Sequence, residues 1–181
     1  IILVLAWSMS EISRELHTAD FLIASLGDSL PAAALPAVIF VLAAFTAFST
    51  GSSWGAMGIL LPLVLPLCWA IMGMEGMTAG EDYFVLYSSV AGVLAGAVWG
   101  DHCSPISDTT VMSSLSAGCD HIEHVRTQLP YALLAGAAAL GAGTLPTSFG
   151  LPWWLGMLAA AAVTVVGLRL LGEPVEDYRP E

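Results

Sequence analysis

The sequence predicts an all-α membrane protein that crosses the bilayer several times. Its 181 residues are 57% hydrophobic and only 10% charged, and its mean hydropathy of +0.82 is far above that of ordinary soluble domains. The charged residues leave three long gaps, 29–74, 83–100 and 127–168. Because a spanning helix needs roughly 20 mostly apolar residues, these gaps hold two, one and two spans. A buried helical core is the alternative, but stretches such as PAVIFVLAAFTAF lack the polar face that it requires.

The expected elements follow the chain in order. Residues 1–9 complete an apolar segment, and the polar SEISRELHTAD connects it to the semi-apolar residues 21–30. Spanning helices are expected over residues 31–50, 55–73, 83–99, 130–147 and 152–171. We therefore expect one transmembrane unit over residues 1–171 and a polar tail over residues 172–181. Because the chain opens IILVLAW, inside an apolar segment, an N-terminal part of the parent protein is expected to be missing.

The charge balance indicates an orientation. The sequence contains fifteen acidic residues but only four arginines and no lysine. The 74–82 loop is acidic, whereas Arg126, Arg169 and Arg179 flank later segments. Basic residues favour the cytoplasmic side, so residues 119–129 and the C-terminus are expected in the cytoplasm of a cell-membrane protein. A lipid bilayer is the expected surroundings, and a nucleic-acid partner is not expected. The acidic balance fits either a high-salt environment or a genome that uses arginine in place of lysine.

The segment GDHCSPISDTT, residues 100–110, is unusually polar for its place after a full apolar span. Pro105 lacks an N–H and disfavours helix at Ser104, so the helix that ends near Gly100 should stop or unwind there. The broken backbone lets side chains and freed carbonyls converge, as in transporters that bind cations at discontinuous helices. The oxygen ligands available to sodium are those of Asp101, Ser104, Ser107, Asp108, Thr109 and Thr110. The alternative is an aqueous loop in which Asp108 caps the next helix.

A second polar break, STGSSWG, covers residues 49–55. Gly51 and Gly55 permit the backbone to unwind or to approach another helix closely. Ser52 and Ser53 add neutral oxygens as further candidate ion ligands. Taken alone, the segment could equally be a helix-packing patch. Together with the break at Pro105, it predicts two discontinuities that face each other.

Soft metal ligands also occur near the second break, namely His102, Cys103, Cys119, Asp120, His121 and His124. Their spacing matches no usual zinc pattern, and the helical H-E-x-x-H of a metallohydrolase is absent from the sequence. Three cysteines without a C-x-x-C predict no disulfide framework. We therefore interpret residues 121–126 as a charged turn at a helix end, and expect no bound cofactor or resident metal.

The motifs resemble those of a known family. AVWGDHCSPISDTTVMSS and CDHIEHVRTQLPYAL closely resemble the sodium/proton antiporter family of the NhaC type, as do GSSWGAMGILLPL and LAWSMSEISRELHTADFL. The resemblance covers residues 1–171 and implies an ion-transporter fold of two inverted repeats, each with one break of either kind. This chain shows one copy of each, so it resembles the C-terminal repeat alone. The matching positions are Asp101, Ser104, Pro105, Ser107, Asp108, Thr109 and Thr110, with Gly51, Ser52, Ser53 and Trp54 in the partner break.

The resemblance implies a secondary antiporter that exchanges Na⁺ for H⁺, and not an enzyme. One carboxylate must bind either a proton or sodium, and burial favours this competition by raising the pKa of a carboxyl group. Asp108 is the first candidate for that carboxylate and Asp101 the second ligand, with the order open. Some relatives exchange organic acids such as malate and lactate, but neither break holds a lysine or arginine to pair with them. A zinc enzyme and a structural subunit are the remaining alternatives, and a homodimer is left open.

Overall fold

The structure is a computed structural model that describes residues 14–26, 30–77 and 79–172, together with residues 4, 8, 11 and 12. Its elements are α2 (Thr18–Leu26), η1 (Ala32–Ala34), α3 (Leu35–Thr50), α4 (Ser53–Met74), η2 (Gly80–Asp82), α5 (Tyr83–Cys103), α6 (Asp108–Ala117), α7 (His121–Ala138), the π-helical η3 (Ala139–Thr144), α8 (Leu145–Ser148) and α9 (Trp153–Leu171). The expected apolar segment 1–9 and the tail after Gly172 lie mostly outside the described residues.

Five helical stretches of the described chain are long and apolar enough to cross a membrane. They are Ala32–Thr50, Ser53–Met74, Gly80–Cys103, His121–Ser148 and Trp153–Leu171. The predicted spans are therefore confirmed in number and order. The fourth begins at His121 and not at residue 130, because the Asp120 carboxylate accepts hydrogen bonds from the amides of Ile122 (3.0 Å) and Glu123 (3.1 Å) and so caps the helix early.

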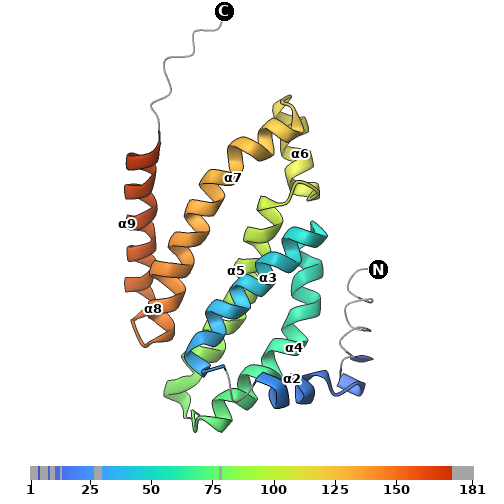
Figure 1. The fold of residues 1–181 in the computed structure, drawn as a ribbon, viewed down its shortest axis with the longest axis vertical. Helices are drawn as coiled ribbons and strands as arrows, with labels where there is room; N and C mark the ends of the chain where they lie inside the picture. Colours follow the sequence, from blue (N-terminus) through green and yellow to red (C-terminus); the bar gives the residue numbers. More distant parts are fainter. Residues whose placement is uncertain are drawn as a thin grey trace, which may run out of the picture.

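Successive spans run in opposite directions (Figure 1). The C-terminal ends of α3 and α5 lie at the end of the bundle that carries α6, whereas η2 and α8 lie at the other end. The helix α5 contacts α3, α4 and α7, and α9 packs against α7 and η3. The acidic 74–82 loop is thus at the opposite end of the bundle from residues 119–129, as expected from the charge pattern.

The closest helix pair, α3 and α5, packs through small residues. A Cβ atom added to Gly92 would lie 2.8 Å from the carbonyl oxygen of Pro36. One turn further along both helices, a Cβ atom on Gly96 would overlap the carbonyl of Phe40, and one on Gly100 would overlap that of Ala44. Glycines at four-residue spacing let two membrane helices approach backbone to backbone. This contact fixes the end of α5, and hence the polar segment that follows it.

A long-range hydrogen bond ties the C-cap of α4 to η1, the short helix that leads into α3. The Glu75 carboxylate, at the end of α4, accepts a hydrogen bond of 2.9 Å from the amide of Ala32. This amide belongs to the first helical turn, where N–H groups lack partners within the helix. The acidic residue therefore serves the end of another helix, in addition to lying in an acidic loop.

Candidate functional site

The second break has the predicted cause. The helix α5 ends at Cys103, and the backbone of Ser104 is extended, with ψ of 129°. The next helix begins at Asp108, and the hydroxyl of Ser107 caps it by accepting a hydrogen bond of 3.3 Å from the amide of Thr109. Residues 104–107 therefore form the second break, as expected from the missing N–H of Pro105 and its clash with helix at the preceding residue.

The first break is shorter. Gly51 ends α3 with φ of 66°, a left-handed conformation that favours glycine. Ser52 is extended and caps α4, its hydroxyl accepting a hydrogen bond of 3.2 Å from the amide of Gly55. Two residues are thus enough to end one span and begin the next.

The two breaks face each other, as predicted. A Cβ atom on Gly51 would lie 2.9 Å from the carbonyl oxygen of Ile106, so the backbones of the two breaks are in direct contact. The hydroxyl of Ser104 also donates a hydrogen bond of 2.7 Å to the carbonyl of Phe48, in the last turn of α3. The span Gly80–Cys103 has 24 residues, about 36 Å at the helical rise, which is enough to cross the hydrocarbon layer. The breaks therefore follow complete spans.

Two of the four predicted helix-breaking residues lie inside helices. Gly100 belongs to α5, and Gly55 belongs to the first turn of α4. Gly100 serves the close approach of α5 to Ala44. Gly51 and Pro105 lie in the breaks themselves, so the helix-break assignment is corrected for Gly55 and Gly100.

The candidate ion ligands divide by burial. Asp101 is 6% exposed, Ser104 and Ser107 are fully buried, and Thr110 is 3% exposed. Asp108 and Thr109 are exposed, and Ser52 and Ser53 are half-buried. Because Ser107 caps α6, Asp108 occupies the first helical position and the break does not bury both carboxylates together. The buried hydroxyls also distinguish the segment from an ordinary aqueous loop.

Asp101 carries the one buried side-chain oxygen in the described residues that has no hydrogen-bond partner, Oδ1. Burying an unsatisfied polar atom is costly, and burying an unpaired carboxylate costs more. In the part of the chain that the structure describes, the ion pairs are Arg14–Glu11, His17–Asp20 and Arg126–Glu123, so no cation there neutralises Asp101. A proton or a bound cation would satisfy this oxygen.

Freed carbonyls of the second break are bound by α7, which the sequence did not indicate. His121 Nε2 lies 2.7 Å from the carbonyl oxygen of Pro105. Gln128 Nε2 donates a hydrogen bond of 2.6 Å to the carbonyl of His102, to which the Thr110 hydroxyl also points at 3.5 Å. The carbonyls of His102 and Pro105 thus each have a hydrogen-bond partner on α7. The available sequence signal was the seven-residue spacing of His121 and Gln128, which places them on one helix face.

The soft ligands do not gather. Within the described ranges, no three His, Cys, Asp or Glu side chains are close enough to hold a metal ion. His121 and His124 instead form hydrogen bonds with the hydroxyls of Ser114 (3.0 Å) and Ser113 (3.1 Å), and Asp120 caps α7. These contacts agree with a polar turn at a helix end.

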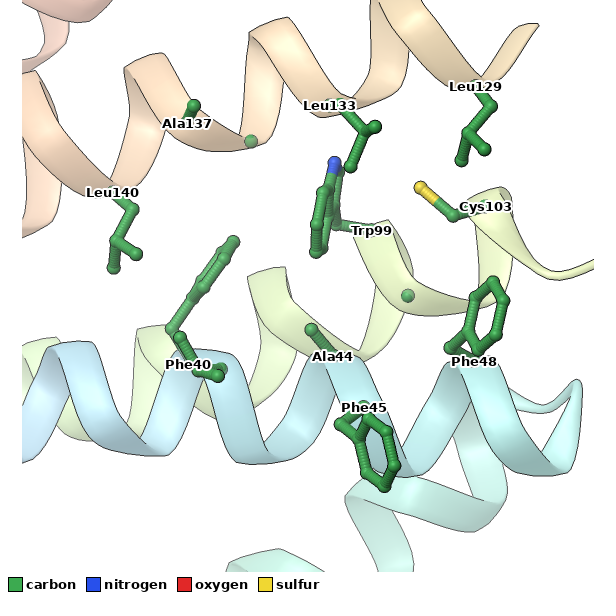
Figure 2. Close-up of a pocket in the computed structure, with 13 residues that line it drawn as sticks. Phe40, Ala44, Phe45, Phe48, Trp99, Cys103, Leu129, Leu133, Ala137 and Leu140 are labelled. Atoms are coloured by element: carbon green, nitrogen blue, oxygen red, sulfur yellow. The ribbon is translucent and has the colours of Figure 1, made fainter.

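An apolar cavity of about 380 Å³ lies beside the second break, between α3, α5 and α7. Phe40, Phe48, Trp99, Leu133 and Leu140 project into it (Figure 2). The indole nitrogen of Trp99 points to α7, where it donates a hydrogen bond of 2.7 Å to the carbonyl of Ala132. A cavity with this lining offers sodium no oxygen ligand.

The spans and the buried polar break define a polytopic helical membrane protein. Residues 1–143 match the model of the Na⁺/H⁺ antiporter family, and the chain belongs to that family.

Three relatives illustrate the range of the family. The chain is 40% identical over 165 residues to an uncharacterised protein of Haemophilus influenzae, covering 91% of this chain and 30% of the relative. It is 35% identical over 98 residues to an uncharacterised Na⁺/H⁺ antiporter of the same organism, covering 52% of this chain and 19% of that relative. It is 32% identical over 90 residues to the malate-2H⁺/Na⁺-lactate antiporter of Bacillus subtilis, covering 49% and 17%. The chain thus spans less than a third of each relative. No solved structure matches it.

Proposed function

We propose that this chain forms part of a secondary active antiporter that exchanges Na⁺ for H⁺ across the cell membrane, with Asp101 as the carboxylate that binds them alternately. The observation that carries the proposal is the buried Oδ1 of Asp101, which has no donor. A proton or Na⁺ each removes the cost of leaving that oxygen unsatisfied, and the two cannot occupy it together. This competition for one oxygen is the elementary requirement of cation–proton antiport.

The other site residues have supporting roles in this proposal. Ser104, Ser107 and Thr110 are buried hydroxyls close in sequence to Asp101 and can supply neutral oxygen ligands. Asp108 and Thr109, exposed at the start of α6, form the approach to the site, and Asp108 adds a negative potential that attracts cations. Ser52 and Ser53 contribute oxygens from the facing break. The sequence favoured Asp108 as the shared carboxylate, whereas this proposal favours Asp101, because Asp101 is buried and Asp108 is exposed.

The proposal includes the finer expectations from the family resemblance. The chain is of the NhaC type, and residues 1–171 are one of two inverted repeats, the other belonging to the rest of the protein. Residues 119–129 and the C-terminus lie in the cytoplasm, on the side where Arg126 and Arg169 are found. The assembly into a homodimer is part of the same expectation and does not affect the site.

The decisive experiment measures sodium-dependent proton movement by the full-length protein in proteoliposomes. Asp101→Asn removes the titratable oxygen and should reduce exchange by more than about 100-fold, the scale of losing a charge-assisted contact of roughly 3 kcal/mol. Asp108→Asn should retain measurable exchange. Asp120→Asn is the matched control, because asparagine also caps a helix and the residue lies outside the breaks. Unimpaired exchange in Asp101→Asn would remove this residue from the mechanism.

Exchange of small organic acids is the second candidate, because one relative is a malate-2H⁺/Na⁺-lactate antiporter. Among the described residues, Arg126 is paired with Glu123 at 3.6 Å and Arg169 is at the end of α9, so neither break holds a cation for a carboxylate substrate. Sodium titrations separate the two functions. Proton competition predicts that the apparent sodium affinity falls about tenfold per pH unit below the pKa of the binding carboxylate. A pH-independent affinity, with flux that requires malate or lactate, would favour the organic-acid exchanger.

A further inference from the structure

We propose that two residues of α7, His121 and Gln128, hold the second break in place by hydrogen bonds to its backbone. We call this pair the α7 clamp and propose that it positions the ion site without binding the ion. The consequence for transport rests on the proposed function, whereas the clamp itself rests on the contacts alone.

The clamp binds the two carbonyls that flank Ser104 and lack their helical donors. In an unbroken helix the carbonyl of His102 would accept from the amide of Ile106, which instead lies 3.4 Å from the hydroxyl of Ser104. The carbonyl of Pro105 would likewise accept from the amide of Thr109, which the Ser107 hydroxyl takes. Carbonyls at a helix end that lose their helical donors are normally satisfied by other groups. Gln128 supplies one at 2.6 Å and His121 the other at 2.7 Å.

The spacing of the two donors explains how one helix can serve both carbonyls. His121 and Gln128 are seven residues apart, which is about two turns and 10 Å along the same helix face. Both side chains are half-buried against the break. Because a carbonyl can only accept, His121 uses Nε2 as a donor in this contact, and Nδ1 lies 3.0 Å from the hydroxyl of Ser114 in α6. The imidazole therefore links α6, α7 and the break.

Asp101 immediately precedes one clamped residue, and Ser104 lies between the two clamped carbonyls. Fixing His102 and Pro105 therefore fixes the backbone that carries the buried carboxylate and hydroxyl. It also gives each of the two carbonyls a hydrogen-bond donor on α7. A shift of α7 would release both carbonyls together, because both donors belong to one helix.

The first test measures how readily Cys103 reacts, and it does not depend on transport. Cys103 is 6% exposed and follows His102 directly. In the full-length protein with every other cysteine replaced by serine, a membrane-permeant maleimide should label Cys103 several-fold faster in His121→Ala and in Gln128→Ala. His124→Ala is the matched control, since its imidazole lies on the same helix but contacts Ser113 (3.1 Å) and not the break. His121→Gln should label slowly, because its amide can donate to the Pro105 carbonyl.

The second test measures sodium-dependent proton movement in the same variants. Loss of one positioning hydrogen bond, worth roughly 1 kcal/mol, should raise the half-saturating sodium concentration about fivefold while the maximal rate changes little. His121→Gln should restore the half-saturation value. Unchanged labelling of Cys103 in both alanine variants, or equal acceleration in His124→Ala, would overturn the clamp. If Cys103 labels faster in the alanine variants but the wild-type protein shows no sodium-dependent proton movement, the clamp is supported and the antiport function is rejected.

Discussion

The two helix breaks touch each other, yet they are stabilised in different ways. The first is capped mainly by its own residues, the left-handed Gly51 and the hydroxyl of Ser52, although the Phe48 carbonyl before it accepts a hydrogen bond from Ser104. The second takes its hydrogen bonds from elsewhere, since Ser104 reaches α3 and α7 supplies donors to the carbonyls on either side. A break that satisfies its own groups keeps its shape when neighbouring helices shift. A break that depends on other helices changes its hydrogen bonds when those helices shift.

Gly51→Ala should have the largest effect on stability, because it strains the backbone of the first break and places a Cβ atom against the backbone of the second. The left-handed conformation costs a non-glycine residue about 1 kcal/mol, and the new Cβ would also lie 2.9 Å from the Ile106 carbonyl. We expect a total loss of about 2–3 kcal/mol, measured as thermal or denaturant unfolding of the purified protein in detergent.

Gly76→Ala is the matched control for this prediction. Gly76 has φ of +74° but nothing within 4 Å of an added Cβ, so its substitution isolates the backbone strain. If Gly51→Ala destabilises the protein no more than Gly76→Ala, the two breaks do not press on each other as described.

Ser104→Ala should have an intermediate effect. It removes the donor of the 2.7 Å hydrogen bond to the Phe48 carbonyl at a fully buried position, which costs about 1–2 kcal/mol. Because the second break depends on this contact, sodium-dependent exchange should fall as well. The same substitution at the exposed Ser116 serves as the control, and equal stability losses at both positions would contradict the assigned role of Ser104.

Ser52→Ala should have the smallest effect of the three and should act locally. Loss of a helix cap costs about 1 kcal/mol, and Ser52→Asp, which can still cap the helix, should recover most of the stability. Maleimide labelling of Cys103 should not change, because the cap serves only α4. Accelerated labelling would show that the first break also controls the second.

The sequence predicted those features that depend on local chemistry. The charge gaps located the spans, and Pro105 located the second break together with the polar residues around it. Proline alone was not sufficient, because Pro62 and Pro66 lie inside α4 and Pro130 lies inside α7. The polar residues around Gly51 and Pro105 also indicated two helix breaks that face each other. Gly100 was misassigned because its role depends on α3: only in the folded bundle does its missing side chain admit the backbone of Ala44.

The ranking of the carboxylates and the α7 clamp could not be read from the sequence for the same reason. Asp101 and Asp108 belong to the same polar stretch, and only the packed helices show that one is buried and the other exposed. Gln128 meets His102 across 26 positions of the chain, and Glu75 meets Ala32 across 43. A single polar residue in a polar stretch gives no indication of such distant partners.

The number of crossings has a topological consequence. With five spans in the described chain, the start of α3 and the end of α9 lie on opposite sides of the bilayer. If the proposed repeat contains these five spans and no other, a second copy joined to it by a short connection would enter the membrane upside down with respect to the first. A repeat must have an odd number of spans for its second copy to be inverted. A repeat with an even number begins and ends on the same side, so both copies have the same orientation. Each break would then have a counterpart at the opposite surface, and the molecule could present related gates to both compartments.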